Sequence, residues 1–224
     1  MSSQQKVSDA NVVFGDGPLA HALAEAESGR CPAFTPDPLD VGREGQHGLT
    51  PLTWAVLRHS LPAVEWLISA GAKPAARSSV GNGRTALHAA AAIDAPVDIL
   101  RALLAGGADV DVLDGRAFDT PLTTSIMSRA YGAMAALIQL GADIMRTDDM
   151  GSTPLHRAGG ISDYRAVMLL LAAGARPDIA DNFGTTFQPL FFMMDEAIMT
   201  REAREGRQEV IDWLISHGYA VEVE

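Results

Sequence analysis

Residues 151–158 read Gly-Ser-Thr-Pro-Leu-His-Arg-Ala, and residues 84–90 read Arg-Thr-Ala-Leu-His-Ala-Ala. The same threonine start recurs at Thr50 and Thr120, each followed by Pro-Leu, and once more at Thr186. Successive starts are 35, 35, 33 and 33 residues apart. Threonine before proline predicts a helix start, because its hydroxyl can accept from free backbone N–H groups and proline at the first helical position loses no needed donor. The spacing therefore indicates repeats of one structural unit.

Each repeat closes on a second landmark, a leucine-rich stretch followed by glycine. The closing residues Gly71, Gly107, Gly141 and Gly174 lie 21, 22, 21 and 21 residues after their threonines. Alanine-rich residues such as 87–91 predict a short first helix, and apolar residues at three- and four-residue spacing predict a second. Glycine supplies the left-handed residue that ends the second helix. The polar, turn-forming stretch before the next threonine predicts an extended arm or hairpin.

These motifs resemble the ankyrin repeat family, whose pattern runs Asp-x-x-Gly-x-Thr-Pro-Leu-His-x-Ala and then Leu-Leu-x-x-Gly-Ala-Asp. The resemblance covers about residues 46–219, which is most of the chain. It implies an all-α solenoid of about five helix pairs with hairpin loops and a curved groove. Each unit of such a stack buries its faces only against its neighbours. We expect repeats at residues 46–80, 81–114, 115–147, 148–180 and 181–219, followed by a tail at 220–224.

Both ends of the array depart from this pattern. Residues 1–45 are predicted to form an N-terminal tail and a degenerate capping repeat, with one amphipathic helix in 12–30 and then too much proline for a partner helix. In the divergent last repeat, Gly218 follows Thr186 by 32 residues instead of about 21. We expect the extra residues, around 195–207, to form an inserted extension of the first helix of that repeat.

Composition restricts the classes of function. Apolar residues make up 47% and charged residues 20% of the 224-residue chain, as in ordinary globular proteins. The formal net charge of −11 argues against nucleic acid or anionic lipid as the main partner. No apolar run reaches the length of about 18 residues that a membrane span requires, so we expect no membrane insertion. The single cysteine, Cys31, excludes an internal disulfide and any multi-cysteine metal site.

The sequence offers no convincing catalytic or metal-binding motif. His88 and His156 occupy the histidine position of the repeat, where the imidazole usually bonds the backbone of the adjacent loop. No two histidines lie at i, i+4 with a carboxylate, and no Gly-x-Ser-x-Gly elbow occurs. Because nearly every residue belongs to a repeat, we expect no enzymatic activity and no cofactor.

We expect partner contacts at the hairpin tips and on the first-helix surface that faces the groove, where side chains are not needed for packing. Aromatic, methionine and arginine side chains, which are over-represented at interface anchors, occur at these positions. The predicted protein-binding residues are His47, Trp54, Arg58, Asn82, Arg84, Arg116, Asp119, Met127, Asp149, Met150, Arg157 and Phe183, and the last repeat adds Phe191 and Met194.

Several of these residues also have a packing interpretation, and both interpretations stay open at this point. Trp54 can fill the space between the first repeat and the N-terminal cap, and Met127 can pack against adjacent helices. Phe191 and Met194 can belong to the core of the terminal repeat. Phe183 is the hardest to explain by packing, because it lies at a hairpin tip.

The sequence therefore predicts a non-enzymatic module that binds and neutralises one specific protein partner. The alanine- and arginine-rich composition, with lysine only at Lys6 and Lys73, indicates a stand-alone bacterial protein. Similar bacterial proteins include immunity proteins paired with secreted toxins, among them lipase effectors of contact-dependent (type VI) secretion systems. Two alternatives are a scaffold or accessory protein that stabilises a partner enzyme, and an enzyme built on the repeat fold.

The partner and the compartment are only partly constrained. The acidic excess favours fast capture of a partner with a basic surface, and we expect the chain alone to be monomeric. The N-terminal sequence is compatible with the cytoplasm, or with the periplasm if an export signal has been removed. An immunity role against a lipase would require the periplasm.

Overall fold

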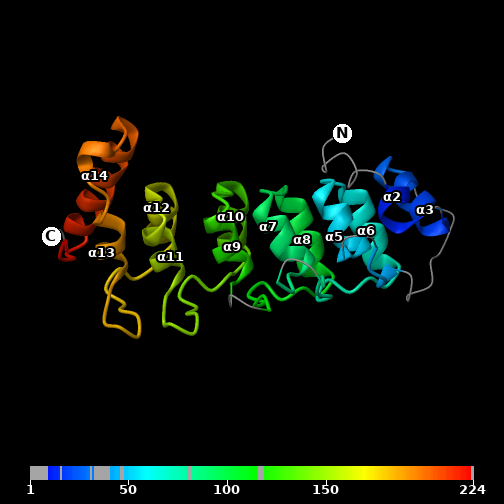
Figure 1. Cartoon of the computed structure of the whole chain (residues 1–224), viewed down its shortest axis with the longest axis horizontal. Helices are drawn as coiled ribbons and strands as arrows, with labels where there is room; N and C mark the ends of the chain where they lie inside the picture. Colours follow the sequence, from blue (N-terminus) through cyan, green and yellow to red (C-terminus); the bar gives the residue numbers. More distant parts are fainter. Residues whose placement is uncertain are drawn as a thin grey trace.

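The computed structural model describes residues 10–15, 17–30, 32, 41–45, 48–79, 82–115 and 119–222. Figure 1 shows helix pairs standing side by side along one row, with the arms that join them all at the same end of the helices. The helices are α2 (Ala10–Phe14), α3 (Pro18–Glu27), α5 (Pro51–Leu57), α6 (Leu61–Ser69), α7 (Ala86–Ala92), α8 (Val97–Ala105), α9 (Pro121–Met127), α10 (Tyr131–Gln139), α11 (Pro154–Gly160), α12 (Tyr164–Ala172), α13 (Phe187–Phe192) and α14 (Arg201–Ser216), with a 3-10 turn at Glu196–Ile198. The expected all-α solenoid of five helix pairs is confirmed, the pairs running from α5/α6 to α13/α14.

The threonine starts and the closing glycines fix the two ends of each helix pair. Every first helix begins directly after its predicted threonine, at Thr50, Thr85, Thr120, Thr153 and Thr186. The Oγ1 of Thr50, for example, accepts from the Thr53 N–H at 3.1 Å. At the other end, Gly71 adopts the left-handed φ of 95°, and the Ala72 N–H donates to the Leu67 carbonyl at 2.9 Å. These local hydrogen bonds satisfy backbone groups that helix ends leave without partners.

The core lies between successive helix pairs. First helices such as α7 present small side chains, Ala86, Ala90 and Ala91, all buried, and α7 packs between α5 and α9. Small side chains let these short helices approach closely. Each second helix contributes a leucine that is wholly excluded from solvent, namely Leu67, Leu103, Leu137, Leu170 and Leu214. The same apolar face thus recurs in every repeat and is covered by neighbouring helices.

Two histidine side chains join adjacent repeats, because each ring bonds to the backbone of both repeats. His88 Nδ1 accepts from the Thr85 N–H at 3.2 Å, and Nε2 lies 3.0 Å from the Asp119 carbonyl oxygen of the next repeat. His156 repeats this arrangement between Thr153 and Thr185, at 3.1 and 3.0 Å. Because an N–H can only donate and a carbonyl can only accept, each ring is the neutral tautomer that carries its proton on Nε2. The interpretation of both residues as structural is therefore supported by their contacts.

The N-terminal cap differs from its prediction. Instead of one helix within residues 12–30, the structure has two, α2 and α3, which pack on each other. Gly15 takes a left-handed φ of 79°, and Pro18, which has no N–H, starts α3. These two residues interrupt the helix. A helix that packs on the amphipathic helix thus precedes it, and α3 covers α6 of the first repeat. The proline-rich residues 33–38, predicted to form no partner helix, lie outside the described residues.

The insert in the last repeat also differs from its prediction. An inserted helix extension is present, but α13 ends at Phe192 and the long helix is α14, the second of the pair. The reason lies in the caps, since Thr200 Oγ1 accepts from the Ala203 N–H at 3.1 Å and so begins a new helix. Its first turns dock on α12, because Gly206 leaves space for the Tyr164 ring, with which a Cβ there would collide.

The turn between the two helices of a repeat is strained in four repeats. His59, Asp94, Arg129 and Ser162 adopt φ values of 54°, 54°, 55° and 50°, where a Cβ is unfavourable. We expect His59→Gly to raise the free energy of unfolding by up to about 1 kcal/mol, since glycine adopts this conformation without a steric penalty. Urea unfolding measures the change. The control His59→Ala keeps the Cβ, so an equal gain in both variants would contradict the explanation.

The His88 bridge makes stability depend on pH. Burial lowers the pKa of His88 below its ordinary value of 6.5, and the Asp119 carbonyl only partly opposes this effect. Below pH 6.5 the unfolded chain therefore binds more protons at this residue than the folded chain does. The contribution of neutral His88 to the free energy of unfolding is complete above pH 6.5 and is lost as the pH falls. Through this one group, the free energy of unfolding changes by at most about 1.4 kcal/mol per pH unit. We expect His88→Gln to flatten the dependence between pH 7.5 and 5, in urea titrations run alongside the unaltered protein; identical slopes would exclude His88 as the cause.

Candidate protein-binding site

Aspartates hold the tips of the last two hairpin arms in fixed turns. Asp148 Oδ1 accepts from the N–H groups of Met150 and Ser152, both at 2.9 Å. Asp181 Oδ1 accepts in the same way from Phe183 at 2.9 Å and Thr185 at 3.0 Å. The backbone bonds from Thr185 and Phe183 lower the pKa of Asp181. Met150 and Phe183 therefore extend from ordered turns.

Neighbouring tips are also bonded to each other. The Asn182 N–H donates to the Met150 carbonyl at 3.0 Å, and its side-chain amide donates to the Asp149 carbonyl at 3.1 Å. Gly151 permits this approach, since a Cβ there would lie 2.7 Å from the Asn182 side-chain oxygen. An N–H from Gly115 likewise donates to the Asn82 carbonyl between two earlier tips, at 2.6 Å. Neighbouring tips are therefore bonded in two pairs, residue 82 with 115 and residues 149–150 with 182.

A hollow of about 420 Å³ opens between the tip at residues 148–152 and the first helices behind it. Met127 and Met150 on its border are each 48% exposed, and Phe183 on the next tip is 72% exposed. The hollow is lined by Met127, Asp148, Asp149, Met150, Ser152, His156, Arg157, Gly160, Ile161 and Leu190.

Charged side chains form a network beneath the tips. Arg157 lies 3.2 Å from Asp119 and 3.3 Å from Asp148, so it joins two neighbouring arms. Arg84 lies 3.6 Å from Asp114 and 3.9 Å from Asp119. Burial raises the pKa of Asp119, while Arg157 acts to lower it. Both arginines are paired within the protein. They therefore stabilise the arrangement of the arms and are less available to contact a partner.

Six of the predicted binding residues gather around these tips. Met127, Asp149, Met150 and Arg157 line the hollow itself. Phe183 stands on the adjoining tip, and Asp119 lies beneath Arg157, where it is largely buried. Asn82 and Arg84 belong to an earlier tip, the first exposed and the second half-buried.

Two predicted residues face the N-terminal cap instead. Trp54 is fully buried, and its ring meets the edge of Phe14 with centroids 6.2 Å apart, so it is a core residue and not part of a binding surface. Arg58 forms an ion pair with Glu27 of α3, with Nη2 2.7 Å from the carboxylate. His47 and Arg116 lie outside the described residues.

Leu190 is one of six lining residues that are absent from the predicted set, although the repeat register identifies its position. It follows Thr186 by four residues, as Trp54 and Arg157 follow their own threonines. Phe191, predicted in its place, is buried between helices. The last repeat continues with Phe-Gln-Pro-Leu after its threonine, where the repeat pattern has Pro-Leu-His, and so the equivalent position was not recognised in the sequence.

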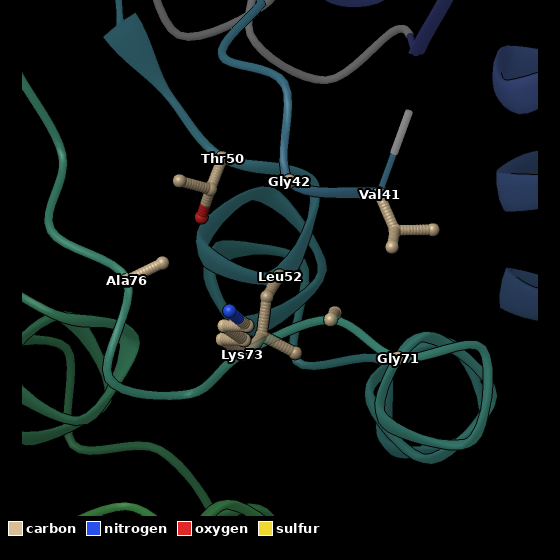
Figure 2. A pocket seen from close by; sticks show the side chains of 8 residues that line it. Val41, Gly42, Thr50, Leu52, Gly71, Lys73 and Ala76 are labelled. Carbon is tan, nitrogen blue, oxygen red and sulfur yellow. The ribbon is translucent and has the colours of Figure 1, made fainter. Parts of the chain in front are cut away.

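A second hollow, of about 380 Å³, lies beside the first repeat. Figure 2 shows Val41 and Gly42 on one side of it and Ala76 on the other, with Leu52 and Lys73 between them. Lys73 is the one ionisable side chain among its eight lining residues. Within the described ranges, no group of three His, Cys, Asp or Glu residues could hold a metal ion, and no helix is both long and apolar enough to cross a membrane.

Comparisons with known proteins agree with this architecture. A family model described as ankyrin repeats (3 copies) matches residues 32–114, and one described as ankyrin repeat matches residues 150–182. The crystal structure of the ankyrin repeat domain of Bcl-3 superposes with a TM-score of 0.69 over 94% of this chain and 90% of that one, at 23% identity.

Two curated relatives illustrate the range of proteins that share these repeats. Protein PhlB of Serratia liquefaciens is 36% identical over 118 residues, which are 53% of this chain and 51% of that protein. Human neurogenic locus notch homolog protein 2 is 37% identical over 122 residues, 54% of this chain but 5% of that protein. The chain thus spans about half the length of PhlB and far less of notch 2.

The five capped helix pairs, the hairpin arms that connect them and the matches to both family models lead to one conclusion. The chain belongs to the ankyrin repeat family.

Proposed function

We propose that this ankyrin repeat protein binds one specific partner protein through the tip surface, defined as Met127, Asp149, Met150 and Phe183 around the hollow. The repeats make the chain a protein-binding module. The observation that carries the choice of surface is the exposure of Met127, Met150 and Phe183 next to turns fixed by Asp148 and Asp181.

The energetics favour this surface over the rest of the groove. Burying apolar side chains on association contributes roughly 25 cal/mol for each Å² removed from water. Because hydrogen bonds already hold the turns in place, binding loses little further conformational entropy. Arg157 below is already paired with Asp119 and Asp148, and contact with the exposed side chains above does not require a partner to displace those ion pairs.

We further propose that binding neutralises the partner by steric coverage, with a secreted bacterial toxin or effector as the partner class and an immunity role for this chain. A lipase effector delivered by a contact-dependent secretion system is one such partner. Two features support the proposal: the net charge of −11, which favours a basic partner surface, and the similarity to a bacterial protein, PhlB.

The double variant Met150→Ser/Phe183→Ala tests the surface. We expect the Kd for the purified partner, measured by isothermal titration calorimetry, to rise at least about 100-fold, because each side chain is placed as an interface anchor. Thermal unfolding should hardly change, since both side chains are exposed. Ile215→Ser is the matched control, because it removes an apolar side chain that is also exposed (62%) but lies on α14.

An activity assay of the partner separates neutralisation from scaffolding. Activity that is lost when the unaltered chain is added, and restored with the double variant, agrees with neutralisation. Activity that survives saturation with the chain shows a scaffold or accessory role instead. An unchanged Kd in the double variant overturns the choice of surface whichever role applies.

A further inference from the structure

The insert of the last repeat exposes apolar side chains away from the hollow. Met193 is 72%, Met194 40% and Ile198 76% exposed, and we call these three residues the insert patch. None of them lines the hollow beside the 148–152 tip. In Figure 1 the start of α14 extends past the level of the neighbouring helices, on the side opposite the hairpin arms. The patch therefore lies apart from the tip surface.

A buried arginine orders the backbone that carries the patch. Arg207, on α14, donates from Nη2 to the Phe192 carbonyl and from Nη1 to the Met194 carbonyl, both at 2.9 Å. Its guanidinium also lies over the Phe192 ring, 5.0 Å from the centroid. Burying a charged group is costly unless such bonds satisfy it. The arginine thereby ties the beginning of the insert to the last helix.

The rest of the insert is folded by short-range bonds. Asp195 Oδ1 accepts from the Ala197 N–H at 2.9 Å, and the Ile198 N–H donates to the Asp195 carbonyl at 3.2 Å. The helix that follows is fixed to α12, where the Tyr164 hydroxyl donates to Glu202 Oε1 at 2.9 Å. An ordered backbone with exposed methionine and isoleucine side chains is prepared for a contact at little entropic cost.

The charges around the patch indicate the chemistry of its partner. Residues 187–200 contain two acidic residues, Asp195 and Glu196, and no lysine or arginine. The Glu196 carboxylate lies 4.0 Å from Nη1 of Arg207, but its side chain is 70% exposed, whereas that of Arg207 is only 8% exposed. The nearest following cation, Arg201, is 2.7 Å from Glu205 and so already paired. The surface offers apolar contact bordered by negative charge.

We propose that the insert patch is a second docking surface, and that it binds a protein segment whose apolar side chains are bordered by lysine or arginine. Methionine side chains suit such a contact because they adapt to the shape of a partner. The proposal extends the proposed function, since both take this chain to bind proteins, but it concerns a different face and different residues. Loss of one surface leaves the other testable.

A random dodecapeptide phage library tests the proposal without knowledge of the natural partner. Phage are selected on the full chain and counter-selected on the triple variant Met193→Ser/Met194→Ser/Ile198→Ser, which alters exposed side chains only. We expect enriched peptides with apolar residues next to lysine or arginine. A synthetic peptide of the enriched sequence should bind the triple variant at least about tenfold more weakly by calorimetry, with unchanged thermal unfolding of the protein.

Two further variants define where and how the peptide binds. Met150→Ser/Phe183→Ala, on the tip surface, should bind the peptide as tightly as the unaltered chain. Glu196→Gln should weaken binding several-fold and reduce its dependence on salt between 50 and 300 mM, because it removes one exposed carboxylate.

Four results would overturn the proposal. They are the absence of any peptide that survives counter-selection, enriched peptides without basic residues, equal weakening by the tip-surface variant, and self-association of the unaltered chain that the triple variant abolishes. The last result would assign the patch to a second copy of this chain. The tip surface keeps its own separate test, which uses the purified partner.

Discussion

A helix pair of this chain can bury its apolar faces only against the pairs before and after it. The alanines of α7, the leucine that each second helix buries and the two histidine bridges all act across that boundary. At each end of the stack one apolar face has no further helix pair to cover it, so another element must cover it. At the start, α3 covers α6 and Trp54 fills the junction against Phe14; at the finish, α14 is long and largely polar on its outer side.

The same constraint leaves the hairpin tips available for binding. Side chains in the helices are used for stacking, whereas the tips extend beyond the stack and are held by their own aspartates and by Asn182. Beneath them, Arg157 joins Asp119 to Asp148, so the charged groups stabilise the spacing of the arms. The apolar side chains of Met127, Met150 and Phe183 remain exposed, and we therefore propose them as the contact groups of this face.

The insert of the last repeat also combines an ordered backbone with exposed apolar side chains, at another place on the molecule. Where an ordinary repeat has a tight turn between its helices, the last repeat has a longer segment. Arg207 orders this segment by donating to two of its backbone carbonyls. Glu202 and Tyr164 fix the added turns of α14 to the preceding repeat. The fold thus presents exposed methionines at the tips and at the insert, and it supports each set by hydrogen bonds that leave their side chains accessible.

The sequence by itself determined the repeat, its register and its helix ends, because each depends on contacts within a few residues: threonine caps, proline at the first helical position and glycine after the last leucine. It also placed Met150 and Phe183 on hairpin tips and Met127 on a first helix, as the structure has them. Only the tertiary structure decided that Trp54 is core and that Arg58 and Arg157 are paired, since their partners, Glu27, Asp119 and Asp148, come from other elements. The insert was assigned to the wrong helix for the same reason. Periodicity in the sequence continued past Phe192, but the Thr200 cap, the carbonyls bound by Arg207 and the space above Gly206 favoured a new helix.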